Sequence, residues 1–562
     1  MEALLQDLKL ALRQLAKSPG FTAIAVLTLA LGIGANTAIF SAVDAVLLRP
    51  LPYPQSDRLV DLSATNAEPV RFAISYPDLL DFRGLTHDFT GVAGYSSQRY
   101  NLTGAGDPRE VQAAFVTADL FDVLGVHPTI GHSFTPQQEN DPVALVSYAL
   151  WAQSYGRDPA ILGKAIALDG KSYTVIGVMP AGFHFPSDGI EVWTPIGGIR
   201  AHEPQALTMR DLHVLNGVGR LTAGATLARA QGDLDVLAKR LQAEQANDTG
   251  QRRIIAIGPG VGPGGGGGGG PRINASSVDQ ITFNAQLLRD AAIGDVSGRL
   301  WVLLGAVGLV LLIACANAAN LLLARAATRG REMAIRRALG AGRGRLIRQL
   351  LTESVVLALV GAGLGIVVSK WGLDALLALW PRALPRSHEV GLHPGVLAFT
   401  AALALLTGIA FGLAPALRAT AVRIEEGLRQ DSAGSTGGRR QRVQHTLVVV
   451  EMSLALVLLV GAGLLARSFA ALNAVSPGFD TRDVLAGRIR LTPSRYPTPP
   501  QQKMFFETVQ SALAGRSDVT GVALSETMPL SGGIRVVAFD PHPVRPDYPG
   551  PYFAALESVV AP

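Results

Sequence analysis

Five long apolar stretches constrain this chain more than any other feature of its sequence. Each is long enough to cross a bilayer, which takes roughly 20 predominantly apolar residues in a helix. One such stretch could be a buried helix of a soluble core, but five in one chain argue against that interpretation. The predicted spans are Phe21–Val43, Leu300–Leu323, Ser354–Leu379, Leu392–Leu417 and Thr446–Leu465.

The composition also indicates a membrane protein. Hydrophobic residues make up 48% of the 562 residues and charged residues 17%, whereas soluble proteins carry about 25% charged residues. The mean hydropathy is +0.28. Because Cys315 is the single cysteine, the chain forms neither a disulfide framework nor a zinc cage built mainly on thiolates.

The first apolar stretch has a second interpretation, a secretory signal peptide, because Lys9, Arg13 and Lys17 precede it. A signal peptide has an apolar core of about 7–15 residues and a small-residue cleavage site. This stretch is about twice that length and no clear cleavage site closes it. We therefore interpret it as a span that is retained.

The distribution of basic residues predicts the orientation of the spans. The net charge is +5 and the pI is about 9.4, and lysine and arginine in short loops mark the cytoplasmic side. They gather in the N-terminal tail and in the loops after the second and fourth spans, whereas the turn after the third span holds only Arg382 and Arg386. The pattern predicts a cytoplasmic N-terminus and makes nucleic-acid binding the weaker interpretation of the charge.

The loop between the first and second spans has about 250 residues, enough for a domain with its own core. Strand and helix patterns alternate along it, which predicts an α+β domain of two lobes. Lys164–Leu168 and Tyr173–Val178 flank Asp169-Gly170, a hairpin pattern. A helix is expected where one face carries Leu227, Ala230, Leu234, Leu237 and Leu241.

Residues after the fifth span resemble the start of a second outside domain. Val484–Leu491 is typical of a strand, and a helix is expected near Gln501–Leu513. A basic tail, a span and an outside domain therefore occur twice in the same order, so the architecture is duplicated with an incomplete second half.

Two short motifs resemble catalytic sites but lack the required spacing. Residues 170–172 are Gly-Lys-Ser, like the end of a phosphate-binding loop, but Ala165 stands where that loop needs glycine. His388-Glu389 and His393 have one residue too many for a zinc-protease helix. We predict no catalytic, cofactor-binding or metal-binding residues.

Polar side chains inside the predicted spans are candidates for function. Hydrogen bonding between helices is the simpler explanation and the one we favour. These residues are Asn36, Thr37, Asn317, Asn320 and Glu451. Glu451 is the exception, because it lies within the first two turns of its span, from where it could also reach the basic flank or a lipid headgroup.

Four segments carry a resemblance to a known family: residues 12–60 (beginning LRQLAKSPGF), 143–186 (VALVSYALWAQSYGRDP), 329–369 (RGREMAIRRALGAGRGR) and 439–480 (RRQRVQHTLVVVEMSLAL). They resemble MacB/FtsX-type ABC transporter permeases, and in particular the duplicated orphan permeases (ADOP-like) of that family. The resemblance implies an α-helical integral membrane protein with a large extracytoplasmic α+β domain, the MacB-like periplasmic core.

The resemblance and the patterns together divide the chain into seven parts. These are a cytoplasmic amphipathic segment (1–20), the first span (21–47), a MacB-like periplasmic domain (48–298) with a glycine-rich linker (258–271), an FtsX-like domain of three spans (299–418) with a cytoplasmic coupling loop (325–352), a cytoplasmic linker (419–445), the fifth span (446–467) and the start of a second periplasmic domain (468–562). Compared with the family, the rest of that last domain and three further spans are missing, so the resemblance implies a truncated chain or a fragment.

The family implies a permease subunit that is not itself an enzyme and binds no cofactor directly. ATP would be held by a separate ABC ATPase subunit, and the chain would couple its hydrolysis to movements of the periplasmic domain for export or mechanotransmission. The lipid bilayer, and a periplasmic adaptor or a homo- or pseudo-dimer partner, are the other expected partners. The expected location is the inner membrane. A membrane-anchored ligand-binding or signalling protein without transport is the alternative.

The candidate ATPase-coupling site lies in the loop after the second span. Glu332 and Arg336 have the i, i+4 order that stabilises a helix, and Ile335 and Leu339 would share a narrow apolar face suited to a groove. The alternative is that this loop only sets orientation and contacts anionic lipid. The candidate coupling residues are Glu332, Met333, Ile335, Arg336, Arg337, Ala338, Leu339 and Gly340.

Overall fold

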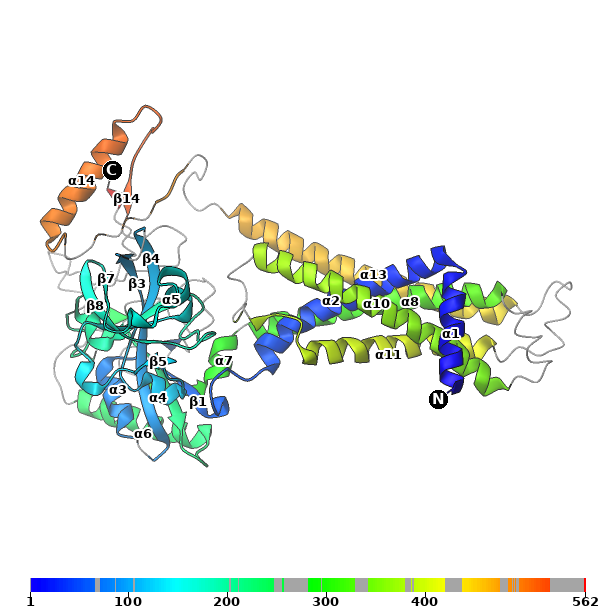
Figure 1. Ribbon diagram of the computed structural model, residues 1–562, viewed down its shortest axis with the longest axis horizontal. Coiled ribbons are helices and arrows are strands. Elements are labelled where there is room, and N and C mark those ends of the chain that lie inside the picture. Colours follow the sequence, from blue (N-terminus) through cyan, green and yellow to red (C-terminus); the bar gives the residue numbers. More distant parts are fainter. Residues whose placement is uncertain are drawn as a thin grey trace, which may run out of the picture. The chain divides into compact units, whose positions relative to one another are not determined.

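The computed structural model divides the chain into two units (Figure 1). One contains residues 1–49 and 295–479, and the other contains residues 50–294 and 480–562. The structure describes all residues except 1, 66–70, 86, 105–106, 202–203, 211, 247–254, 257–280, 295, 329–341, 380–385, 387–388, 420–436, 476–483, 488, 490, 492–494, 526–559 and 562.

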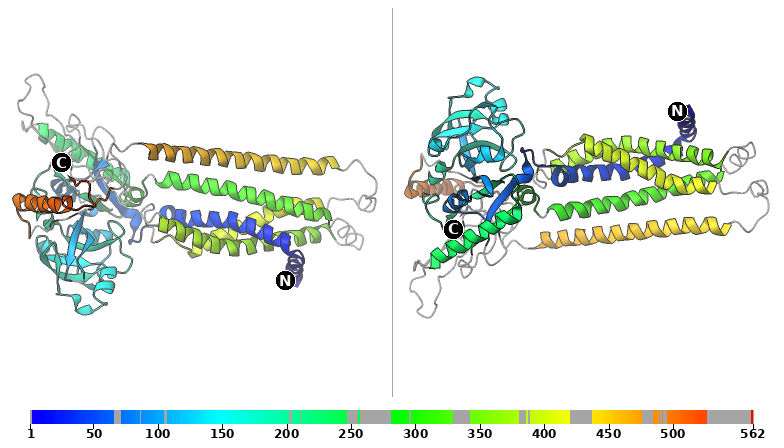
Figure 2. Two further views of the ribbon diagram at one scale, coloured as in Figure 1. Left: turned by 90° about the horizontal axis from the view of Figure 1, so that it is seen from above. Right: turned by 90° about the horizontal axis from the view of Figure 1, so that it is seen from below.

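The first unit is built of helices. They are α1 (Glu2–Ala16), α2 (Pro19–Val43) with a π-helical continuation, η1 (Asp44–Leu48), then α8 (Val296–Thr328), α10 (Arg343–Leu379), α11 (Pro394–Ala419) and α13 (Gly437–Ala474). Figures 1 and 2 show that the axes of α2, α8, α10, α11 and α13 are roughly aligned with one another, while the axis of α1 lies across them. Five helices are long and apolar enough to cross a membrane: Pro19–Leu48, Val296–Arg325, Arg343–Ala375, Pro394–Leu413 and Val448–Ala474.

Each predicted span corresponds to one of these five helices, and two of the helices begin more than two helical turns before the predicted residue. α10 begins at Arg343 instead of Ser354, and α13 begins at Gly437 instead of Thr446. The apolar pattern predicts only the part of a helix that lies in the hydrocarbon of the bilayer. Arginine, leucine and glutamine are good helix formers in water, so the helix continues into the polar flank.

Glycines allow α2 and α10 to pack closely. A Cβ atom on Gly34 would lie 2.8 Å from the carbonyl oxygen of Gly365, and one on Gly361 would lie 2.9 Å from the Cβ of Leu29. Gly361 and Gly365 are one helical turn apart, the spacing of small residues that lets helix backbones approach in membranes. On α11, a Cβ on Gly412 would lie 2.7 Å from the side chain of Ser354 of α10. α10 is therefore packed between α2 and α11.

The second unit is an α+β domain built around a mixed sheet. Among the described residues the sheet has eleven strands in the order β13-β1-β11-β3-β4-β9-β6-β8-β5, with β2 beside β1 and β7 beside β3 and β8. The strands are β1 (Leu59–Thr65), β2 (Arg71–Phe72), β3 (Phe89–Thr103), β4 (Arg109–Val116), β5 (Ile130–Gly131), β6 (Val143–Val146), β7 (Ala165–Leu168), β8 (Lys171–Val178), β9 (Ile190–Pro195), β11 (Asn216–Leu221) and β13 (Thr282–Leu287).

Helices and short strand pairs complete this unit. The helices are α3 (Tyr76–Arg83), α4 (Leu120–Leu124), α5 (Tyr148–Ser154), α6 (Leu227–Ala246), α7 (Leu288–Ile293) and α14 (Pro499–Ala514), with short 3₁₀ turns at Ser56–Arg58, Pro136–Gln138, Pro159–Ile161 and Ile196–Ala201. The remaining strands form two pairs, β10 (Leu212–His213) with β12 (Ile255–Ala256), and β14 (Leu524–Ser525) with β15 (Val560–Ala561).

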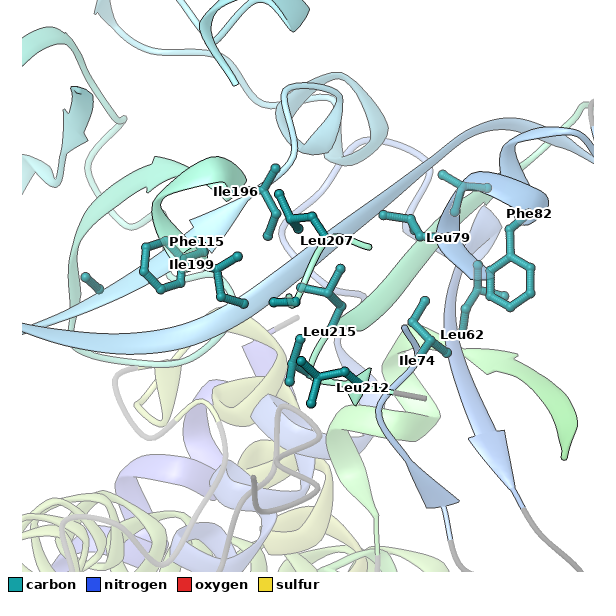
Figure 3. Close-up of a cluster of buried hydrophobic side chains, with 14 of the residues drawn as sticks. Leu62, Ile74, Leu79, Phe82, Phe115, Ile196, Ile199, Leu207, Leu212 and Leu215 are labelled. Atoms are coloured by element: carbon teal, nitrogen blue, oxygen red, sulfur yellow. The ribbon is translucent and has the colours of Figure 1, made fainter. Parts of the chain in front are cut away.

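The two faces of the sheet carry two hydrophobic clusters. Alternate residues of β3 point to opposite sides, so Val92 belongs to one cluster and Ala93 to the other. The first cluster is covered by α3 and α6, and Figure 3 shows Leu79 and Phe82 of α3 in it. The second is covered by α4 and α7. The predicted two lobes therefore share one continuous sheet.

Local sequence patterns predicted several of these elements correctly. β7 and β8 form the predicted hairpin, and its turn residues Asp169 and Gly170 have φ angles of 49° and 74°. These positive angles are those of a tight two-residue turn, so Lys171 is a strand residue. α6 buries the predicted face, with Ala230, Leu234, Leu237 and Leu241 in the core.

Two predictions of strands need correction. The sequence His213–Arg220 is typical of one strand, but the structure divides it between β10 and β11, and Leu215 at the break forms an isolated bridge with Ile74. In Val484–Leu491, the described residues 484–487, 489 and 491 have no strand structure. Leu485 is 98% exposed, so the alternating pattern there has no described neighbour to pair with.

Candidate functional site

The predicted coupling residues lie in a segment for which only the flanks are described. Glu332, Met333, Ile335, Arg336, Arg337, Ala338, Leu339 and Gly340 all lie outside the described residues. The flanks are α8, which ends at Thr328, and α10, which begins at Arg343. The described part of the candidate site therefore consists of the residues that contact the end of α8 and the start of α10.

The amphipathic helix α1 packs beside this site. Asp7, Ala11 and Leu15 are spaced i, i+4 and i+8, and all three are buried. Ala11 and Leu15 belong to a cluster with Ala25 and Val26 of α2 and with Val356 and Leu357 of α10. One face of α1 is thus fixed against two membrane-crossing helices.

The buried carboxylate of this face binds the first turns of α10. Nε of Arg348 donates a hydrogen bond of 2.8 Å to a carboxylate oxygen of Asp7. The Asp7 side chain is 11% exposed and that of Arg348 45%. Partial burial of one partner makes such a pair stronger than a fully exposed one. This contact fixes the flank that follows the predicted coupling residues.

The preceding flank is held by the other end of α1. Arg325, in the last turn of α8, donates a hydrogen bond of 3.0 Å to the carbonyl oxygen of Gln14 and lies 4.7 Å from the ring centre of Phe21. The last carbonyls of a helix carry partial negative charge, which attracts a cation, and an aromatic face does the same. The Thr22 hydroxyl donates to the carbonyl of Leu15 at 2.8 Å and joins α1 to α2.

The sequence patterns did not identify the residues that make these contacts. Asp7, Gln14 and Arg348 were not among the predicted coupling residues. Asp7 carried a usable signal, because it shares one helical face with Ala11 and Leu15, and a charge on an apolar face indicates a partner. The identity of that partner, Arg348, required the tertiary structure.

Two polar residues inside the spans bond between helices, as predicted. Nδ2 of Asn36 in α2 donates to the carbonyl of Val307 in α8 at 2.8 Å, and the hydroxyls of Thr37 and Thr400 join α2 to α11 at 3.0 Å. Within the described residues, the side chains of three others make no hydrogen bond to another helix, and for them the interpretation stays a prediction. These are Asn317, Asn320 and Glu451.

A second ionic cluster lies where α2 ends, next to the turn between α10 and α11. Arg386 is held by two hydrogen bonds to Glu389, at 3.0 and 2.6 Å, and donates a third, of 3.1 Å, to the carbonyl of Arg49. Arg49 in turn pairs with Asp44 at 2.8 Å. Since the Arg386 side chain is only 11% exposed, its contact anchors the last residue before the second unit begins.

These contacts hold helices in place. Among the described residues, no group of three or more His, Cys, Asp or Glu side chains is placed to hold a metal ion. Glu389, which the sequence placed in a motif resembling a zinc site, is the partner of Arg386.

The fold and the site define the class of this protein. It is an α-helical membrane protein in which a large α+β domain is inserted between the first and second membrane-crossing helices. Two family models match this architecture: a MacB-like periplasmic core domain at residues 22–237 and an FtsX-like permease C-terminal domain at residues 304–423. The chain belongs to the MacB/FtsX-type ABC transporter permeases, and the large domain is extracytoplasmic.

Individual relatives agree with this assignment. The uncharacterized ABC transporter permease YknZ of Bacillus subtilis is 35% identical over 144 residues, which are 25% of this chain and 34% of that protein. The macrolide export ATP-binding/permease protein MacB of Chlorobaculum tepidum is 25% identical over 320 residues, 56% of this chain and 43% of that protein. The chain therefore spans less than half the length of these two relatives.

The similarity extends to solved structures. The periplasmic region of MacB from Actinobacillus actinomycetemcomitans covers 38% of this chain and 99% of its own length, with 12% identity and a TM-score of 0.28. The family inferred from the sequence is confirmed by the family models, and its duplicated orphan group remains a prediction.

Proposed function

We propose that this chain is the permease subunit of an ABC-type transporter. A separate ATPase subunit would hydrolyse ATP, and the chain would convert that reaction into movement of its extracytoplasmic domain, for export or mechanotransmission. The observation that carries this proposal is the pair of contacts around residues 329–341. Arg325 before this segment and Arg348 after it are both held by α1.

A segment held in this way is suited to receive a mechanical input. A force on residues 329–341 passes into α10, which is one continuous helix from Arg343 to Leu379 and packs against both α2 and α11. Beyond α10, Arg386 contacts Arg49, where the chain leaves for the extracytoplasmic domain. The FtsX-like match at 304–423 contains most of α8, this segment, α10 and α11.

We assign the docking role to the predicted coupling residues, with Ile335 and Leu339 as apolar anchors. The Chlorobaculum relative is named an ATP-binding/permease protein, and for this chain the ATPase as a separate subunit is part of our proposal. The proposal also includes the inner membrane with a cytoplasmic N-terminus, and a periplasmic adaptor or a second copy as a further partner.

The test replaces the two anchors by acid, Ile335→Asp with Leu339→Asp, and measures binding to the ATPase subunit that co-purifies with the full chain. Buried apolar anchors usually contribute most of an interface, so we expect roughly 30-fold weaker association and a matching loss of stimulated ATP hydrolysis. All arginines of the loop remain, so the orientation of the spans should not change.

A matched control places the same charges elsewhere. Leu162→Asp with Val236→Asp alters two exposed side chains of the extracytoplasmic domain and should leave ATPase association unchanged. If the anchor variant binds the ATPase as well as the unaltered chain, the loop is only an orientation signal. The ligand-binding or signalling alternative would then be favoured.

A further inference from the structure

The helix α1 has exposed surface that the helical unit does not use. The face with Asp7, Ala11 and Leu15 is packed against α2 and α10, but Leu8 is 40% exposed and Leu12 50%. These two leucines are one turn apart and form an apolar edge beside the packed face. Leucines at this spacing are unfavourable in water unless another apolar phase covers them.

A row of basic side chains follows the side of α1 opposite to the packed face and continues to Lys17, the first residue after the helix. Lys9, Arg13 and Lys17 are spaced i, i+4 and i+8 and are exposed. At 1.5 Å per residue they extend over about 12 Å of helix. Within the part of the chain that the structure describes, no ion pair involves these three side chains.

The position of α1 limits what can cover these surfaces. Only Lys17 and Ser18 separate its end from the start of the membrane-crossing helix α2. Figures 1 and 2 show α1 lying across the direction of the membrane-crossing helices. A helix attached in this way lies along the bilayer surface, where both an apolar edge and a basic row find partners.

We propose that α1 binds an anionic phospholipid surface. Leu8 and Leu12 enter the boundary of the acyl chains, and Lys9, Arg13 and Lys17 contact the phosphate groups, the arrangement typical of interfacial amphipathic helices. The charge complementarity with anionic headgroups selects this surface over neutral lipid.

Lipid binding at α1 has a consequence for the proposed coupling site. The packed face of the same helix holds Arg348 through Asp7 and Arg325 through Gln14. Anionic lipid that orders α1 therefore also orders both ends of residues 329–341. This consequence depends on the proposed function, whereas lipid binding itself does not.

The experiment compares the full chain in nanodiscs of phosphatidylcholine alone and in nanodiscs that also contain phosphatidylglycerol. Amide hydrogen exchange is measured in peptides that cover residues 6–16. We expect exchange about tenfold slower with phosphatidylglycerol, and we expect the difference to vanish at about 1 M salt, where the Debye length falls to about 3 Å. No ATPase is present, so the result is independent of the proposed transport function.

Two variants define the outcome. Lys9→Gln, Arg13→Gln and Lys17→Gln together should abolish the effect of phosphatidylglycerol, whereas Lys9→Arg, Arg13→Lys and Lys17→Arg together should retain it, because charge is conserved. Equal exchange in both lipid mixtures, or slowing that persists in the glutamine variant, overturns the proposal. Slowing that appears only when the ATPase subunit is added would assign the surface to a protein instead.

Discussion

Asp88 is a buried carboxyl in the extracytoplasmic domain whose charge is costly. Its side chain is fully buried and lies 3.0 Å from Nε of Arg229, which is 64% exposed. The neighbouring Asp233 carboxyl is the main cause, and burial a smaller one, that raises the pKa of Asp88 above its ordinary value of 3.8, although Arg229 acts in the opposite direction. A raised pKa means that the folded domain holds this proton more tightly than the unfolded chain does.

The pH dependence follows from that sign. The stabilisation linked to Asp88 is fully present below pH 3.8 and is lost as the pH rises through the raised pKa. Asp88→Asn keeps a hydrogen-bonding group without the charge, so it should raise the thermal midpoint of the domain at neutral pH and leave it nearly unchanged in acid. The exposed pair with Arg229 is worth little. Thermal unfolding across pH checks this, with Asp141→Asn as the exposed control; a lower midpoint at neutral pH would contradict it.

At the scale of elements, the contact between α2 and α10 depends on the absence of side chains at particular glycines. Gly365 faces Gly34 and Ala30 of α2, and a Cβ atom on Gly365 would lie only 3.1 Å from their backbone atoms. Gly363, two residues earlier on the same helix, has no atom within 4 Å of the corresponding position. Both glycines are therefore in the same helix, but only Gly365 is packed against α2.

Gly365→Leu should separate α2 from α10 and destabilise the helical unit by about 1–3 kcal/mol, the usual cost of overpacking. Gly363→Leu is the matched control and should be neutral, because its side chain has open space. Unfolding of both variants in detergent, followed by circular dichroism, provides the measurement. Equal destabilisation by the two leucines would show that helix propensity or lipid contact, rather than the helix crossing, determines stability.

At the scale of the whole molecule, the family and the charge pattern lead to a definite topology. Gln6 of α1 and Lys239 of α6 are both exposed, and the proposed orientation places them on opposite sides of the membrane. In a Cys315→Ser background, Lys239→Cys should react with an impermeant maleimide in spheroplasts with an intact inner membrane. Gln6→Cys should react only after that membrane is opened. Labelling of Gln6→Cys in intact spheroplasts would reverse the orientation and remove the coupling segment from the cytoplasm.

Features that depend only on residues close together in the sequence could be predicted from the sequence alone. The five spans follow from apolarity, since a helix needs no distant partner to prefer lipid. The β7–β8 hairpin follows from Asp169-Gly170, and the buried face of α6 follows from its 3.6-residue period. The family resemblance also came from short segments of the sequence. One of those segments contains the candidate coupling residues, whose role remains a prediction.

Contacts between distant residues were decided only by the tertiary structure. β1 lies between β11 and β13, which follow it by more than 150 residues. Asp7 meets Arg348, and Arg386 meets the carbonyl of Arg49, across still longer separations. Any of the chain's 44 acidic residues could in principle pair with any of its 49 basic ones. Which of them meet depends on how the helices pack, and that packing depends on small residues such as Gly34 and Gly365, whose spacing has meaning only once the two helices are side by side.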